Sequence, residues 1–90
     1  MLNELFEIIE ARKRERPQGS YTAELLSGGE DEILKKVGEE AMEVILAAKG
    51  QGKQRLVEET ADLFYHVLVM LAYKNLTLTD IEDELRRRHR

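Results

Sequence analysis

The sequence contains no cysteine, which excludes a disulfide framework and a thiolate zinc site. Its longest apolar run, from Leu63 to Tyr73 with His66 inside it, is shorter than the roughly 20 residues that a membrane-spanning helix needs. The first residues, Met1 to Leu5, do not form a basic region followed by a long apolar run, so no secretory signal is expected. These absences predict a cytoplasmic protein without a membrane segment.

Positive charge is also in short supply. The chain has 14 lysines and arginines against 18 acidic residues, a net charge of −4, whereas proteins that bind nucleic acid in general present a basic surface. No nucleic-acid partner is therefore expected. The 90 residues fit a single domain over 1–90, and a chain of this length buries only about 60 to 65% of its unfolded surface. Because its stability margin is small, contacts with a partner chain would help it.

The single proline and several of the six glycines mark the ends of predicted helices. Apolar residues recur at helical spacing from Leu2 onward, and this first helix must stop before Pro17, because the residue before a proline is kept out of the α region. Ser20 is placed to cap a short second helix. That helix is expected to end at Gly28 and Gly29, where the left-handed conformation is tolerated.

Two long helices are expected next, one extending to about Lys49 and one from about Lys53 to Tyr73. The connection between them contains Gly50 and Gly52 and is short, which suits an antiparallel helix hairpin. No strand-like alternation appears anywhere. The sequence therefore predicts an all-α fold, an antiparallel bundle of four to five helices.

The end of the chain adds two further expectations. The second half of the 53–73 helix is apolar on every side, and a helix of this kind must be buried all round, which predicts a homodimer in which it packs across the subunit boundary. A last helix is expected to begin with a capping box formed by Thr79 and Glu82. Its inward-facing residues would be Leu78, Ile81 and Leu85.

The two long predicted helices each carry a pair of carboxylates spaced i,i+3. Glu40 and Glu43 share one face of the first, and Glu59 and Asp62 share one face of the second. Both pairs lie at the margin of an apolar stripe, where two packed helices can direct them to one point. Four carboxylates in close proximity repel one another, and hard oxygen ligands in that number suit Mg²⁺, Mn²⁺ or Ca²⁺. The alternative is two acidic helix faces that simply lie in water.

Three segments give the chain its resemblance to a known family. It resembles the stand-alone phosphoribosyl-ATP pyrophosphohydrolases, the histidine-biosynthesis branch of the all-α, MazG-like nucleoside triphosphate pyrophosphohydrolases. The matching residues are Gly19-Ser20-Tyr21-Thr22 with Leu25-Leu26; Ile33 to Glu40 with Glu43, Val44 and Ala47-Ala48-Lys49; and Glu59 to Leu63 with Tyr65-His66 and Val69. The paired acids mark only the superfamily, whereas the first and third segments distinguish this branch.

The resemblance implies a reaction and a set of roles. The reaction is the Mg²⁺-dependent hydrolysis of phosphoribosyl-ATP to phosphoribosyl-AMP and pyrophosphate, with Mn²⁺ as a possible substitute. The implied metal ligands, which also form the catalytic set, are Glu40, Glu43, Glu59 and Asp62. Glu39 is a further catalytic candidate, as a holder of a metal-bound water or as a general base, although an ordinary exposed acid would look the same in the sequence.

Substrate contacts are assigned with alternatives. Lys36 lies one turn before Glu40, where it either reaches a substrate phosphate or forms an i,i+4 ion pair with Glu40. Ser20, Tyr21 and Thr22 belong to the family signature and either contact the phosphoribosyl group or brace the dimer. His66 either orients the Asp62 carboxylate or is a hydrogen-bonded histidine in the interface.

Two other functions compete with this interpretation. A housecleaning enzyme of the same superfamily would hydrolyse damaged or excess nucleoside triphosphates, but the Ser20–Thr22 segment and Tyr65-His66 argue against it. A non-catalytic helical dimerisation module would keep its acids as a solvated face. It predicts no tight dependence on a divalent ion and tolerance of Glu40→Gln.

Overall fold

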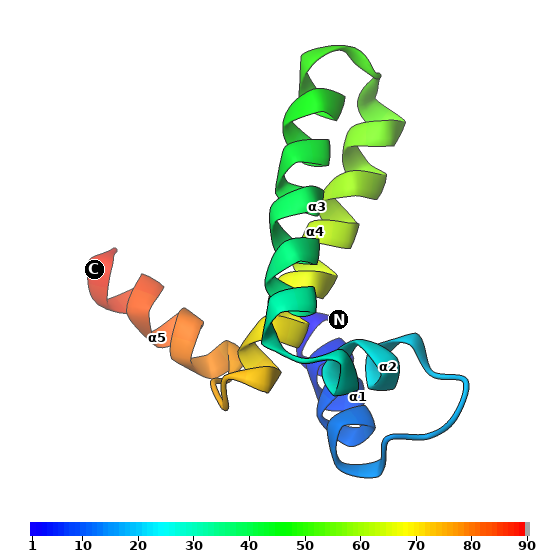
Figure 1. Cartoon of the computed structure of the whole chain (residues 1–90). Coiled ribbons are helices and arrows are strands. Elements are labelled where there is room, and N and C mark those ends of the chain that lie inside the picture. The colour runs from blue at the N-terminus through cyan, green and yellow to red at the C-terminus, as the bar shows by residue number, and fades with distance from the viewer. Residues whose placement is uncertain (90) are drawn as a thin grey trace.

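The computed structural model describes residues 1–89 and contains five α-helices (Figure 1). The described residues contain no strand, so the predicted all-α class is confirmed. The last residue of the single domain expected over 1–90 lies outside the described part. The helices are α1 (Leu2–Glu15), α2 (Tyr21–Gly28), α3 (Glu30–Gly50), α4 (Lys53–Tyr73) and α5 (Leu78–Arg88).

The boundaries of the first three helices follow the residues expected from the sequence to end or cap them. Helix α1 ends with Arg16 in the left-handed conformation, at a φ of 50°, immediately before Pro17. The hydroxyl of Ser20 accepts a hydrogen bond of 3.1 Å from the backbone N–H of Ala23 and so caps α2. Gly29, at a φ of 97°, separates α2 from α3, a conformation that costs glycine little.

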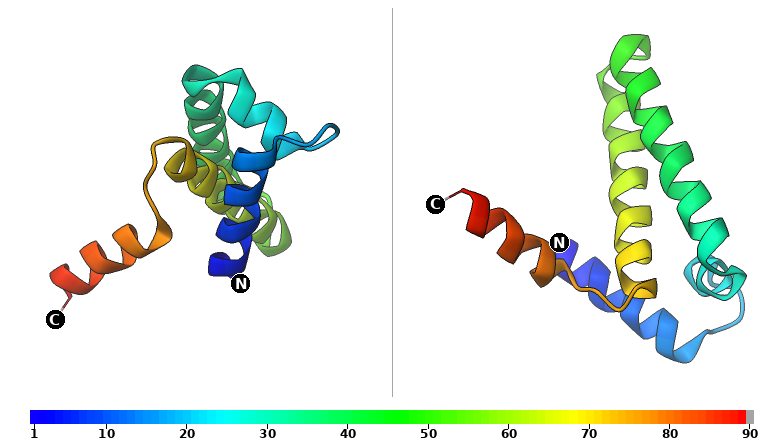
Figure 2. Two further views of the ribbon diagram at one scale, coloured as in Figure 1. Left: turned by 90° about the horizontal axis from the view of Figure 1, so that it is seen from below. Right: turned by 60° about the vertical axis from the view of Figure 1, so that its left-hand side comes forward.

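Helices α3 and α4 form the predicted antiparallel hairpin, which is the longest part of the molecule (Figure 1). Helices α1 and α2 pack around the end of the hairpin opposite to its turn at residues 51–52 (Figure 2). The core lies at this base, and its largest fully buried side chains come from four different helices: Ile9, Leu26, Ile33 and Val69. The other end of the hairpin, with its turn, extends away from the core.

Helix α1 is also tied to the end of α4 by a polar contact. The ammonium group of Lys13 donates hydrogen bonds of 2.7 Å to the backbone carbonyl of Ala72 and to the side-chain oxygen of Asn75. Ala72 belongs to the last turn of α4, where backbone carbonyl groups lack the partners of a continuing helix, and Asn75 lies two residues beyond the end of α4. The contact therefore holds α1 against α4 and also supplies a hydrogen-bond donor to a backbone carbonyl at the end of α4.

Helix α5 extends away from the other four helices (Figure 2), and none of its residues is buried. The capping box predicted at Thr79 and Glu82 is wrong. Thr77 is the N-cap residue, its hydroxyl accepts from the backbone N–H of Asp80, and the Asp80 carboxylate accepts from the backbone N–H of Thr77. Ile81, which was expected to face inward, is 39% exposed.

The second half of α4 is largely, but not completely, covered within the chain. Phe64 is 50% exposed in the single chain, so the predicted burial of this half across a subunit boundary stays a prediction. The buried residues of this half are His66, Leu68, Val69, Leu71 and Ala72. None of the helices within residues 1–89 has the length and hydropathy to cross a membrane.

Candidate metal and substrate site

Three of the four predicted metal ligands meet between α3 and α4. Glu40 on α3 and Glu59 and Asp62 on α4 each offer one carboxylate oxygen, and these oxygens lie within 4.8 Å of one another. Glu59 and Asp62 are one turn apart on the same face, so the i,i+3 spacing brings them together as predicted. Glu43, the fourth predicted ligand, is not part of this group and lies one turn further along α3, half-buried.

Burial differs between the three carboxylates. Glu59 is 5% exposed, Glu40 is half-buried and Asp62 is exposed. The cluster therefore extends from the inside of the hairpin to solvent, which gives an ion a direct path to the ligands. Three carboxylate oxygens, with an exposed side at which water or phosphate oxygens can complete the coordination, fit a hard divalent cation such as Mg²⁺.

The electrostatics at Glu59 are those of a carboxylate that lacks sufficient positive charge. Burial raises the pKa of Glu59 above its usual range, and the nearby negative charges of Glu40, Asp62 and Glu43 raise it further. Arg55 acts in the opposite direction, because its guanidinium Nη2 lies 3.0 Å from Oε1 of Glu59. A divalent cation would remove most of the repulsion that a single arginine leaves.

Glu39 and Lys36 pair with each other at the edge of the cluster. The ammonium nitrogen of Lys36 lies 3.8 Å from Oε1 of Glu39. Among the described residues this is the ion pair that Lys36 makes, so the alternative in which it pairs with Glu40 is not realised. Glu39 is exposed and outside the group of three converging carboxylates.

The Tyr21 hydroxyl and His66 form a partly buried hydrogen-bond chain that ends at Asp62. Nδ1 of His66 lies 2.7 Å from the backbone carbonyl oxygen of Asp62, and Nε2 lies 3.1 Å from the Tyr21 hydroxyl. Because a carbonyl only accepts, Nδ1 carries a proton and donates it to this oxygen, while Nε2 shares the second hydrogen bond with the Tyr21 hydroxyl. His66 thus contacts the main chain of Asp62 instead of its carboxylate, and it is a hydrogen-bonded histidine within one chain.

Thr22 and Tyr65 extend this contact between α2 and α4. Their hydroxyl groups are hydrogen-bonded to each other. The ring of Tyr65 packs edge-on against His66, with centroids 4.9 Å apart, and stacks with the ring of Tyr21 at 6.3 Å. The signature segment therefore fixes the start of α2 against α4, one turn beyond Asp62. Within this segment, Tyr21 is 49% exposed.

Arg55 is the residue at this site that sequence reasoning missed. It lies four residues before Glu59, a spacing at which a helical arginine and glutamate are neighbours. The same spacing rule that was applied to Lys36 could have identified it. The carboxylates form a recognisable pattern because they occur in pairs, whereas a single arginine in the first turn of a helix gives no comparable signal.

Comparison with known proteins decides the family. Residues 2–89 match the family described as phosphoribosyl-ATP pyrophosphohydrolase. The chain belongs to the phosphoribosyl-ATP pyrophosphohydrolase family. The resemblance found in the sequence is thereby confirmed over almost the whole chain.

Individual members of the phosphoribosyl-ATP pyrophosphohydrolase family are similar to this chain over almost its whole length. A phosphoribosyl-ATP pyrophosphatase of Metallosphaera sedula is 52% identical over 88 residues, which cover 98% of this chain and 95% of the relative. One of Nitrosospira multiformis is 54% identical over 98% of this chain and 73% of its own. A histidine biosynthesis bifunctional protein of Bacillus subtilis is 51% identical over 99% of this chain, but this region is only 43% of that protein.

Proposed function

We propose that this chain hydrolyses phosphoribosyl-ATP to phosphoribosyl-AMP and pyrophosphate, an early step of histidine biosynthesis, in the cytoplasm. Family membership over residues 2–89 and the names of its relatives support the substrate. The observation that carries the chemistry is the convergence of Glu40, Glu59 and Asp62 within 4.8 Å between two helices. A solvated acidic face, as in the non-catalytic alternative, gives no reason for one of these carboxylates to be buried.

The ion proposed for this site is Mg²⁺, with Mn²⁺ as its substitute. Glu40, Glu59 and Asp62 would hold it, and Glu43 lies close enough to Glu59 to add negative charge. When bound, the ion neutralises the triphosphate, orients it and stabilises charge on the leaving pyrophosphate. The protein otherwise supplies positioning and electrostatics, which dominate phosphoryl-group chemistry.

The remaining residues act around the carboxylates. Glu39, exposed at the edge of the cluster, accepts the proton of the attacking water. Lys36, half-buried beside it, exchanges its ion pair with Glu39 for a phosphate of the substrate. The exposed ring of Tyr21 provides a contact for the phosphoribosyl-adenine part, while the hydroxyls of Ser20 and Thr22 keep that ring in place through their bonds to Ala23 and Tyr65.

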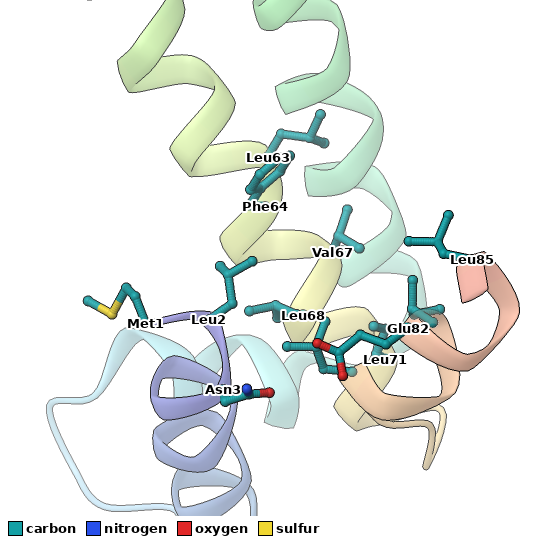
Figure 3. A pocket seen from close by; sticks show the side chains of 12 residues that line it. Met1, Leu2, Asn3, Leu63, Phe64, Val67, Leu68, Leu71, Glu82 and Leu85 are labelled. Atoms are coloured by element: carbon teal, nitrogen blue, oxygen red, sulfur yellow. The ribbon is translucent and has the colours of Figure 1, made fainter. Parts of the chain in front are cut away.

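The functional unit that we propose is a homodimer, because the chain leaves an apolar groove uncovered. The groove has a volume of about 750 Å³ and lies between the start of α1, one face of α4 and helix α5 (Figure 3). Phe64 and Leu85 line it and are 50% and 52% exposed. A second copy that covers this groove would bury the apolar face of α5, which has no buried residue in a single chain.

The experiment that tests the function is turnover of phosphoribosyl-ATP with Mg²⁺, with ATP and dCTP in parallel and with pyrophosphate distinguished from orthophosphate. We expect pyrophosphate from phosphoribosyl-ATP alone and its loss with EDTA and in Glu40→Gln. Glu7→Gln, an exposed acid on α1, is the matched control and should keep full activity. Preference for a plain nucleotide would assign the chain to housecleaning, and hydrolysis of none of the three would contradict an enzymatic role.

A further inference from the structure

Arg55 places a positive charge directly against the carboxylate cluster. Its guanidinium bridges two acids of α4, with Nη2 3.0 Å from Oε1 of Glu59 and Nη1 3.3 Å from Oε1 of Glu58. The Arg55 side chain is 49% exposed, whereas the Glu59 side chain is 7% exposed. The guanidinium therefore lies between the buried carboxylate of the cluster and the solvent-exposed side of the site, from which a ligand would enter.

Arg55 and Lys36 lie on opposite sides of the cluster along the hairpin. Arg55 precedes Glu59 by one turn on α4, and Lys36 precedes Glu40 by one turn on α3. Helices α3 and α4 are antiparallel (Figure 1). From their order in the chain, Arg55 therefore lies toward the turn of the hairpin and Lys36 toward its base. The first turn of α4 holds no acidic residue, so its positive dipole end adds to the charge of Arg55.

This arrangement should affect the binding of a divalent cation alone and the binding of a cation together with phosphate in opposite ways. A divalent ion that enters alone meets a guanidinium already paired with one of its ligands. At a separation of about 6 Å in well-screened surroundings, that repulsion weakens its binding by about three- to tenfold. A polyphosphate that binds with the ion brings oxygens on which the guanidinium can donate, so the same charge then becomes favourable.

We propose that Arg55 couples metal binding to phosphate binding, so that the site takes a divalent cation poorly alone and well together with a polyphosphate. Arg55 acts as a positioning residue toward the cation, through Glu59, and as a direct contact to the phosphates. The inference rests on the proposed metal site and names the residue that governs the order in which that site fills. Premature filling by free ions is thereby reduced.

Two binding measurements test this coupling without turnover. The first titrates Mn²⁺ alone and follows the free ion by its paramagnetic resonance signal. The second follows radiolabelled pyrophosphate by equilibrium dialysis in excess Mg²⁺. In Arg55→Gln we expect Mn²⁺ alone to bind about three- to tenfold more tightly and pyrophosphate to bind at least about threefold more weakly. Arg86→Gln removes an arginine paired with Asp83 on α5 and should change neither affinity.

The two changes must have opposite signs. Arg55→Gln that binds Mn²⁺ equally well or more weakly would show that Arg55 only orders Glu59, and an unchanged pyrophosphate affinity would remove its role toward phosphate; either result overturns the inference. Arg55→Lys keeps the charge and should keep the Mn²⁺ affinity near that of the original protein. This variant tests the role of the charge even if Arg55→Gln unfolds. If the unaltered protein binds neither Mn²⁺ nor pyrophosphate, the proposed metal site fails and the inference with it.

Discussion

Glu59 is the residue at which stability and function oppose each other. Its carboxylate is buried between two helices and surrounded by further acids, and a single guanidinium offsets this negative charge. A fold selected for stability alone would replace it with an apolar or amide side chain. Its presence at this position is consistent with a ligand that requires the charge.

The replacement Glu59→Gln should stabilise the protein at neutral pH in the presence of a chelator. The pKa of Glu59 is raised by folding, so its stabilising contribution is complete below the unfolded value of 4.5 and is lost as the pH rises through the folded value. Glutamine resembles the protonated form at every pH. The gain in thermal midpoint should therefore be visible near neutral pH and shrink as the pH falls toward about 4.

Thermal melts of both proteins between about pH 4 and pH 8 in EDTA give the measurement. Glu58→Gln is the matched control, because Glu58 is also paired with Arg55 but is exposed, and its midpoint should not shift in the same direction. A lower midpoint for Glu59→Gln at neutral pH would mean that the ion pair with Arg55 outweighs the cost of burial.

The sequence predicted these residues unevenly. The convergence of the carboxylates could be predicted, because helical spacing alone places Glu59 beside Asp62 on one face and the hairpin brings Glu40 to them. The hydrogen-bonded link from Tyr21 through His66 to the backbone of Asp62 could not be predicted from the sequence. It depends on the packing of α2 against α4 and on side-chain rotamers, which no spacing rule contains.

At the scale of elements, the junction between α4 and α5 shows how a local motif is chosen. Two overlapping pairs occur here: Thr79 with Glu82, which was predicted as the capping box, and Thr77 with Asp80, which forms it. The end of α4 decides between them. Asn75 adopts a left-handed φ of 61°, and the backbone N–H of Leu76 donates to Leu71 at 2.8 Å, so the chain is already extended at Thr77.

Because Thr77 and not Thr79 is the N-cap residue of α5, two similar substitutions should have different effects. Thr77→Ala removes the acceptor for the N–H of Asp80 and should destabilise α5 by about 1 kcal/mol. Thr79→Ala, within the helix, should leave it unchanged or slightly more stable. Because α5 has no buried residue in a single chain, the loss should appear as faster amide hydrogen exchange within α5. Faster exchange in Thr79→Ala alone would restore the frame that the sequence first suggested.

At the scale of the whole molecule, the apolar groove is the feature that a single chain leaves unfinished. The sequence indicated a helix with more apolar surface than 90 residues can cover. The structure covers much of it with α1 and α2 and leaves the rest between α4 and α5 (Figure 3). Sequence patterning could predict the excess of apolar surface but not its location, which depends on the direction in which α5 leaves the bundle.

Leu85→Glu should dissociate the proposed homodimer. Leu85 lines the groove, and a carboxylate placed there would have to be desolvated in the interface, weakening association by about a hundredfold or more. Sedimentation velocity over a range of concentrations gives the measurement. Ile8→Glu is the control, since Ile8 is 49% exposed, similar to Leu85 at 52%, but does not line the groove. A monomer in the unaltered protein, or equal effects of the two substitutions, would contradict the assignment of the interface.

The position of α4 in the chain has a consequence for synthesis on the ribosome. Lys13 reaches Ala72 across 59 positions, and the buried core of α1 and α2 closes against α4. Since the N-terminal part of a chain emerges first, α1 and α2 are made without the helix that covers them. By contrast, the hairpin joins neighbouring helices through a short turn, and closing so short a loop takes little entropy. The nascent chain therefore stays open until α4 has left the exit tunnel, and the core and the carboxylate cluster then form in the same late event.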